Sequence, residues 1–490
     1  MIKIKDTWNR IRKQKAIKRI NSFLYSNWFI LFAALFTIIG NVFAIELYVY
    51  TFFTLIALYV SLFGDDYLPY APMIVFCFIM PNYKNNPGNS EQSVFYSGHG
   101  GGWVMALAVA IVVFLLFRMC IDDELGFKHL FKTKHAFFWG MIALGCAYLV
   151  SGIGSDYYEK YWAKNIVIAL LEFAAMAVPY FLLLAAIRWE KVDKKYFAYI
   201  GVAMGLIVGV ELLYVFFAND VIVDDKINRL RIYAGWGINN NMGAIVSMSV
   251  PCAFYFVYKG VKPILYNGVA ILLCLFSVLT CSRGSILASA AAYLFCLVLI
   301  FIFSSSKKGK VIVTCSALAL AVACVALLGT KFNGLAAAFA NGFVSEGRLK
   351  LYSLGLQFFK GDPVFGTTFF SLSEYSLDKN VNWIWSIVGD FKSFFPGRWH
   401  NTIVQILASC GIVGAAGYAF HRLQTIILFA KNITAEKLFI GLSIVVLLGM
   451  SLIDCHFFNL GPTLIYSIAL AFAEGHDRVQ SNPLPKELTK

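Results

Sequence analysis

The chain consists largely of long apolar stretches that are separated by short polar connections. Most stretches run for about 15 to 25 residues with few charges, which is the length that a helix needs to cross a bilayer. We predict fourteen such spans, near residues 28–45, 47–63, 67–80, 102–117, 136–153, 164–187, 197–217, 242–257, 264–280, 285–303, 311–328, 401–420, 438–453 and 457–473. The pattern predicts an all-α polytopic membrane protein with about 12–14 transmembrane helices and one large external loop.

Composition and charge agree with this class. Hydrophobic residues make up 59% of the 490 residues, charged residues only 14%, and the mean hydropathy is +0.71. Soluble domains contain about 45–50% apolar residues, so a soluble protein is excluded. The formal charge of +14 does not indicate nucleic acid, because the basic residues form short clusters between apolar stretches, as membrane topology requires.

The basic clusters also predict the orientation of the chain. Residues 3–19 carry eight Lys or Arg and precede the first apolar run, which ends without a small-residue cleavage site. We interpret this region as an uncleaved signal anchor with a cytoplasmic N-terminus. The even-numbered connections are then cytoplasmic, and 27 of the 41 Lys and Arg residues lie on the cytoplasmic side, which supports the assignment.

This topology divides the sequence into five segments. The first has apolar residues at helical spacing among its charges, as expected of an in-plane helix on anionic membrane lipids. The segments are 1–26 (basic, amphipathic and cytoplasmic), 27–328 (an N-terminal bundle of about 11 spans), 329–399 (a large extracytoplasmic loop), 400–475 (C-terminal spans) and 476–490 (a cytoplasmic tail).

Cations on the external face need a separate explanation. Five of them are arginines, namely Arg229, Arg231, Arg283, Arg348 and Arg398. Arg283 lies in a connection of about five residues, so its guanidinium must sit at the membrane surface, where a cation without an anion is costly. Alone it could snorkel to lipid phosphate. A cluster of arginines is better suited to a pyrophosphate group, because the planar fork binds phosphate oxygens in pairs.

The stretch "GRWHNTIVQILASCGIVG" places His400 at the mouth of an apolar helix. Histidine has an ordinary pKa of about 6.5 and can act as a general base. The alternative is an interfacial ring beside Trp399 in an aromatic belt. Asn401 is equally suited to capping the helix, and Gly411 and Gly414 are better explained as helix-packing contacts.

Four further titratable residues lie in or near the spans. Glu172 and Glu211 are candidates for a proton path, although Glu172 is also compatible with a hydrogen-bonded structural role and Glu211 is close to an interface. Asp454 and His456 lie by the last external turn, where we expect solvation to account for them. Neither a Walker loop nor H-E-x-x-H nor an acidic metal cluster occurs in the sequence, so we expect no metal and no cofactor.

The segment "HNTIVQILASCGIVG" resembles the signature of the bacterial O-antigen ligase and O-antigen polymerase family, which follows a large extracytoplasmic loop. Three other segments resemble family elements: "CSRGSIL", "RLRIYAGWGINNNMGA" and "GRLKLYSLGLQFFKGDPVFG". Together they cover about residues 225–420. The chain departs from the family where "TTFF" replaces a second glycine after "PVFG", and where Arg229 and Arg231 compete for one position, of which we favour Arg231.

The resemblance implies an inverting, metal-independent glycosyltransferase at the outer face of the bacterial cytoplasmic membrane. It would move a glycan from an undecaprenyl-pyrophosphate carrier to a hydroxyl of a glycan, lipid or protein acceptor, and a flippase and a chain-length regulator are further expected partners. The implied roles are general base for His400, pyrophosphate binding for Arg283, Arg231, Arg229, Arg348 and Arg398, and support for Asn401, Gly411 and Gly414.

A flippase or transporter of lipid-linked oligosaccharide is the alternative function. Such a protein would carry polar residues along a central cavity and would show internal repeats with broken helices. Here the cations gather on the external side and no repeat is evident. We therefore favour the transferase, while the sugars, the acceptor and the choice between polymerase and ligase stay open.

Overall fold

The computed structural model describes most of the chain. The described residues are 7–8, 10–43, 45–79, 101–121, 136–218, 221–223, 226–227, 232, 239–329, 346–379 and 397–481. Arg229 and Arg231 lie outside them.

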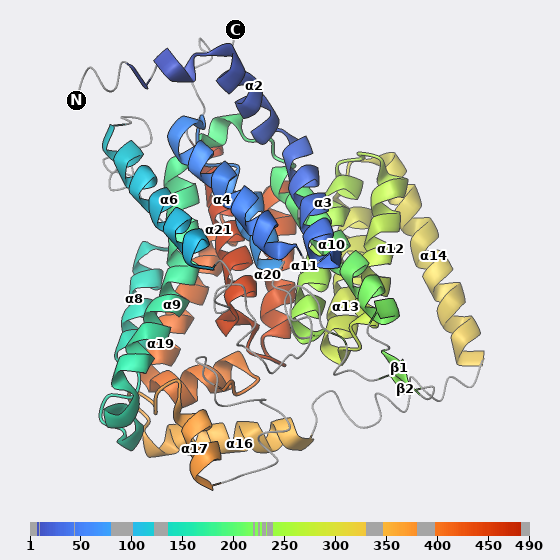
Figure 1. Ribbon diagram of the computed structural model, residues 1–490. Helices are drawn as coiled ribbons and strands as arrows, with labels where there is room; N and C mark the ends of the chain where they lie inside the picture. The colour runs from blue at the N-terminus through green and yellow to red at the C-terminus, as the bar shows by residue number, and fades with distance from the viewer. Residues whose placement is uncertain are drawn as a thin grey trace. The chain divides into compact units, whose positions relative to one another are not determined.

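Helices form nearly all of the described structure (Figure 1). They are α2 (Lys15–Leu24), α3 (Asn27–Phe43), α4 (Glu46–Phe63), α5 (Tyr70–Ile79), α6 (Gly101–Ile121), α8 (Phe138–Leu149), α9 (Asp156–Ala186), α10 (Tyr196–Ala218), α11 (Asn239–Tyr258), α12 (Pro263–Leu279), α13 (Arg283–Phe303), α14 (Lys307–Gly329), α16 (Glu346–Gly361), α17 (Ser371–Lys379), α19 (Thr402–Ala430), α20 (Ala435–Met450) and α21 (Leu460–Ser481). Two 3-10 turns, η2 (Trp189–Lys191) and η4 (His456–Phe458), and a hairpin of β1 (Ile222–Val223) and β2 (Lys226–Ile227) complete the elements.

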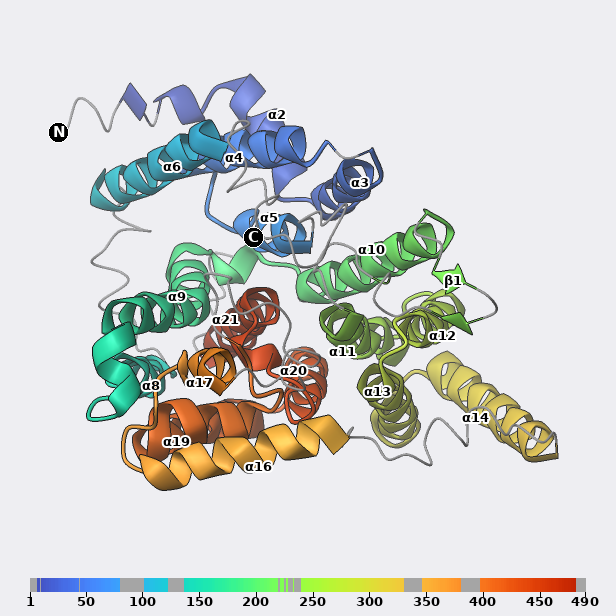
Figure 2. The same cartoon turned by 60° about the horizontal axis from the view of Figure 1, so that its bottom comes forward.

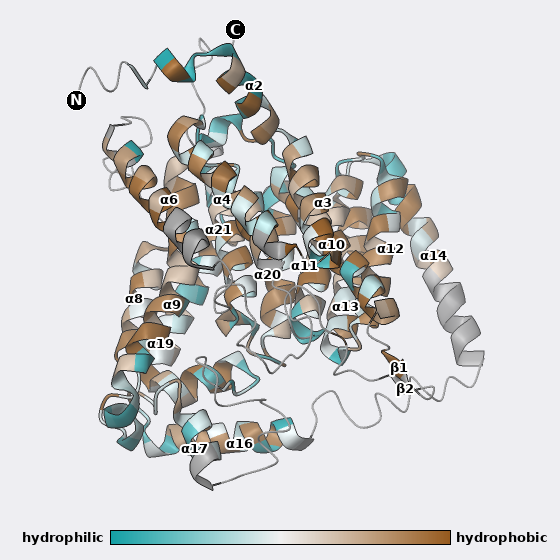
Figure 3. Cartoon of the chain, viewed as in Figure 1, coloured by the Kyte–Doolittle hydropathy of each residue, from teal (hydrophilic) through white to brown (hydrophobic). Residues whose placement is uncertain are grey.

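The predicted all-α polytopic class is confirmed. Each of the fourteen predicted apolar stretches overlaps one helix, and Figure 3 shows apolar residues along the helices with hydrophilic ones gathered at helix ends. Among the described residues, five helices are long and apolar enough to cross a membrane, or six if α2 and α3, bent by 70°, form one span. This number is below the predicted 12–14 because several apolar helices, α8 and α12 among them, are shorter than a full span.

The helices belong to two compact units. Unit 1 consists of Met1–Ala136, Met176–Met242 and Leu464–Lys490, and unit 2 of Phe137–Ala175 and Gly243–Thr463. In unit 1 the basic N-terminal segment is held against the end of α4. The indole of Trp8 donates to the carbonyl of Leu62 (2.7 Å), and the amide of Asn21 donates to that of Phe63 (3.0 Å).

Unit 2 contains the main described part of the predicted loop, residues 346–379, and the helix that follows it. Helix α16 of the loop lies along α19 (Figure 2), and α19 also packs against α8. Helices α12, α13 and α14 pack side by side, and α13 contacts α20. The segment 346–379 is therefore packed against α19, which follows it. It also contacts α9, which precedes it, because the amide of Phe369 donates to Oδ1 of Asn165 (3.0 Å).

Helix α19 is broken at Gly411, where the backbone adopts φ 63° and ψ −156°. The turn Pro363–Gly366, between α16 and α17, fills the break. Two residues that follow the break donate to this turn: the amide of Ile412 donates to the carbonyl of Pro363 (2.8 Å), and the amide of Val413 donates to that of Val364 (3.2 Å). The amide of Thr367 in turn donates to the carbonyl of Ala408 (2.8 Å). Loop and helix thus complete each other's hydrogen bonds.

Glycine is required at the break for two reasons. Its positive φ is unfavourable for other residues, and a Cβ on Gly411 would lie 2.4 Å from the carbonyl oxygen of Val364. Gly366 opposite has a φ of 69° and is equally crowded. Thr368, in the "TTFF" segment that stands in place of the expected second glycine, adopts a φ of 79°, so the turn keeps a left-handed residue in this segment.

We predict that Gly411→Ala lowers the free energy of unfolding by about 2 kcal/mol or more, because the new methyl adds both a clash and backbone strain. The measurement is equilibrium unfolding of the purified protein in detergent. Gly449→Ala in α20 is the matched control, because a Cβ there meets no atom within 4 Å; it should be neutral or slightly stabilising. Equal stability of the two variants would contradict the proposed constraint.

Candidate active site

The connection between α20 and α21, residues 451–459, is the point at which the predicted site elements meet. We call it the α20–α21 turn. The amide of Thr402 donates to the carbonyl of Ser451 (2.9 Å), and the side-chain amide of Asn401 donates to that of Leu452 (2.7 Å). Nη1 of Arg348 donates to the carbonyl of Ile453 (2.9 Å). Consecutive backbone carbonyls of one turn therefore bind the start of α19 and the start of α16.

His400 is paired with Asp454 in this turn. Nδ1 of His400 lies 2.9 Å from Oδ1 of Asp454, whose residue is only 4% exposed. Burial acts to raise the pKa of Asp454, but the nearby His400, His456 and Arg348 outweigh it and hold that pKa well below its usual range. An ionised carboxylate can only accept, so Nδ1 carries a proton, and in the neutral form of this tautomer the lone pair lies on Nε2.

Two residues of α16 support this pair. Arg348 places its Nη2 3.7 Å from Oδ2 of Asp454. The hydroxyl of Tyr352 donates to the backbone carbonyl of His400 (2.8 Å), and burial raises the pKa of Tyr352 to about 12. The phenol therefore stays protonated at neutral pH and can donate. It holds a residue whose φ of 52° is unusual for a side chain larger than glycine.

Arg398 is committed to an ion pair. Its Nη2 donates to Oε1 of Glu172 in α9 (2.5 Å) and to the carbonyl of Phe458 (2.7 Å). The guanidinium also lies over the ring of Phe458, 5.6 Å from its centre. This contact supports the interpretation of Glu172 as a hydrogen-bonded structural residue. Glu211 of unit 1 is 2% exposed and accepts from the side-chain amide of Asn41.

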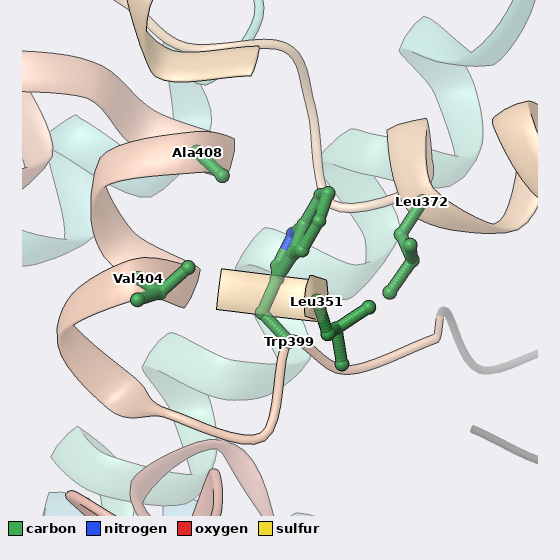
Figure 4. Close-up of a cluster of buried hydrophobic side chains, with 5 residues drawn as sticks. All are labelled: Leu351, Leu372, Trp399, Val404 and Ala408. Carbon is green, nitrogen blue, oxygen red and sulfur yellow. The ribbon is translucent and has the colours of Figure 1, made fainter. Parts of the chain in front are cut away.

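Trp399 is a core residue, so the aromatic-belt alternative for this side chain is wrong. Its indole is 0% exposed and packs against Leu351, Leu372, Val404 and Ala408 (Figure 4). The ring centre lies 5.4 Å from that of Phe358 in α16. This cluster joins both loop helices to α19 and fixes the residue next to His400.

Asn401 caps α19, as one of its two interpretations predicted. Its Oδ1 accepts from the amides of Ile403 (2.9 Å) and Val404 (3.1 Å). The side-chain amide of Asn401 is bound to the carbonyl of Leu452 in the α20–α21 turn. Asn401 therefore caps α19 and attaches its start, next to the strained His400, to this turn.

Arg283 is the first residue of α13, and Ser282 caps this helix (3.5 Å to the amide of Ser285). A Cβ added to the neighbouring Gly284 would lie 3.3 Å from Cδ1 of Ile453. The start of α13 therefore lies against the same turn that carries Asp454. Arg348, Arg398 and His400 thus contact residues 451–459, and Arg283 begins the helix that lies against the same turn, while Arg229 and Arg231 lie outside the described residues.

The expectation that solvation accounts for Asp454 and His456 is wrong. The two residues are 4% and 0% exposed, because the turn folds inward under α16 and the start of α19. One signal in the sequence could have identified them, namely two titratable residues within an otherwise apolar stretch, "SLIDCHFFNL". Such residues need partners when they are buried.

Part of this chain matches a known protein family. Residues 268–419 match the O-antigen ligase family, Wzy_C. No curated protein matches the chain. The family match confirms the resemblance found in the sequence and supports glycan transfer in a membrane, with a lipid-linked donor and a glycan acceptor. The matched region includes Arg283, Arg348, Arg398 and His400 and ends before Asp454.

We predict that Glu172→Gln lowers the free energy of unfolding by about 2–3 kcal/mol, because it leaves the largely buried Arg398 without its counter-charge. The double variant Glu172→Gln/Arg398→Gln should recover much of this loss. A double-mutant cycle of unfolding in detergent measures the coupling. Strictly additive effects would show that the ion pair contributes nothing to the fold.

Proposed function

We propose, from the match of residues 268–419 to the O-antigen ligase family, that the protein transfers a glycan from a polyprenyl-pyrophosphate carrier to an acceptor hydroxyl. The observation that carries this proposal is the contact of His400 with the buried carboxylate of Asp454 (2.9 Å) beside the start of α13. It provides a positioned base beside the helix that begins with Arg283, and a base and a cation are the two groups that the reaction needs.

His400 is the general base in this proposal and Asp454 is its positioning residue. Asp454 holds the ring by Nδ1 and stabilises the imidazolium once it forms, as the acid does in a catalytic triad. Nε2 takes the proton of the acceptor hydroxyl. The hydroxyl oxygen forms a bond to the anomeric carbon while the bond to the pyrophosphate oxygen breaks. The electron pair leaves with the carrier pyrophosphate, and one displacement inverts the anomeric centre.

Arg283 is the residue that we assign to the departing pyrophosphate. Arg348 and Arg398 are each paired with an acid, so we assign them to positioning the segment 398–400 and the α20–α21 turn. Arg229 and Arg231 stay candidates for the pyrophosphate on the basis of the sequence. A guanidinium stabilises negative charge that develops on phosphate oxygens, and in this proposal it takes the electrostatic role of a divalent metal.

The site is proposed to face the outside of the bacterial cytoplasmic membrane, with the N-terminus in the cytoplasm. The distribution of Lys and Arg along the sequence supports this orientation. Glycan, lipid and protein acceptors all provide the hydroxyl that the mechanism requires, so polymerase and ligase activities share one chemistry. Transport of the lipid-linked glycan would not require the His400–Asp454 pair, and loss of turnover on its removal separates the two functions.

We predict that His400→Ala lowers kcat about 10²- to 10⁴-fold and leaves the affinity for the carrier unchanged, because the base acts only in the transition state. Asp454→Asn should lower kcat about 10²-fold or more, since the amide no longer favours the proton on Nδ1. The measurement is conjugate formation from undecaprenyl-pyrophosphate glycan. Lys360→Gln, on the exposed face of α16, is the control. Near-native turnover of folded His400→Ala would refute the catalytic assignment.

Arg283→Ala is predicted to weaken carrier binding as well as turnover, by about tenfold or more in each, because it removes a charge-assisted contact. Arg283→Lys should restore little, since an ammonium cannot bridge two phosphate oxygens. Binding of undecaprenyl pyrophosphate without glycan is measured beside the reaction rate. If both variants bind this carrier as the parent does, the pyrophosphate must be bound elsewhere.

A further inference from the structure

An apolar groove with a cationic rim lies in unit 2 between the first turns of α12 and α14. Its volume is about 820 Å³, within the range of about 300–1,000 Å³ that is typical of ligand sites. The rim carries Lys262, Lys307 and Lys308, and the walls include Ile264, Leu265 and Val311.

The walls continue away from the rim as a purely aliphatic surface. Ile264 is 78% exposed and Val311 is 61% exposed. One turn further along the helices the groove is closed, because the side-chain amide of Asn267 in α12 donates to the hydroxyl of Ser316 in α14 (2.9 Å). The two helices are therefore joined below the groove and separated above it, which leaves a slot lined by carbon atoms.

The rim lysines differ from others at the same end of the bundle. Lys259 is neutralised by Glu436 (3.1 Å). Within the described part of the chain, Lys262, Lys307 and Lys308 pair with no carboxylate. The positive ends of the α12 and α14 dipoles point the same way and add to the potential. Lys262 is also held at a φ of 40°, directly before Pro263. Three cations thus surround one end of an apolar slot.

We propose that this groove binds one anionic phospholipid, with its phosphate among the three lysines and an acyl chain along the aliphatic walls. The charge of the rim favours an anion, and the walls offer no hydrogen-bonding partner to a soluble one. A zwitterionic lipid would fill the walls but would gain less from the lysines. The site belongs to the end of the bundle that the basic connections mark as cytoplasmic, and it is independent of the glycan-transfer proposal.

The test is native mass spectrometry of the delipidated full-length protein in a non-ionic detergent. Phosphatidylglycerol should bind at one site with at least about tenfold higher affinity than phosphatidylethanolamine of the same acyl chains. The variant Lys262→Gln/Lys307→Gln/Lys308→Gln should lose this preference. The control Lys191→Gln/Lys194→Gln/Lys195→Gln has the same net charge and alters lysines between α9 and α10, on the side predicted to be cytoplasmic. It should keep the preference, and an equal loss in both variants would overturn the proposal.

A second variant tests the apolar part of the site. Leu265→Trp fills the groove but keeps all three lysines, so it should weaken phosphatidylglycerol binding about tenfold or more. Glycerol phosphate, which has no acyl chain, should bind the parent protein far more weakly than phosphatidylglycerol does. If it binds equally well, the rim is a plain anion site and the lipid assignment fails. If phosphatidylethanolamine binds as well as phosphatidylglycerol, the lysines play no part and the assignment also fails.

Discussion

The buried carboxylate of Asp454 is the constraint on which the proposed site depends. A charge that is 4% exposed is tolerated only when it is paired and hydrogen-bonded. Asp454 meets this requirement with His400, Arg348 and the amide of Cys455. These partners come from the start of α19, from α16 and from the α20–α21 turn. The pairing of a single buried anion therefore joins three segments that are distant in the sequence. The geometry of His400 follows from that assembly.

Much of the helical architecture could be predicted because membrane spans leave a local signal. An apolar stretch indicates a helix by its own composition, and α19 begins directly after Asn401, as the capping interpretation suggested. The cap at Asn401 was also predictable, since capping involves neighbouring amides only. Helix lengths were harder to predict from the sequence, because the hydropathy pattern does not distinguish a short apolar helix such as α8 from one that crosses a whole bilayer.

Pairings across the chain could not be predicted from these signals. Nothing in the hydropathy around Glu172 identifies Arg398 as its partner, and solvation was the simplest explanation for Asp454 until its 4% exposure was known. The break at Gly411 was hidden for the same reason. In sequence a glycine within an apolar helix indicates close packing, whereas its conformation depends on a turn that lies in the preceding loop.

That break has a consequence for how the protein matures. Chain synthesis proceeds from the N-terminus, so Pro363–Gly366 emerges before α19 does. The amides of Ile412 and Val413 and the carbonyl of Ala408 find these partners only when the turn lies against the break. With the turn displaced, these groups would be left unsatisfied in an apolar helix, at several kcal/mol each, roughly. The native form of α19 therefore depends on a turn that precedes it in the chain, and the helix cannot reach this form as an isolated segment.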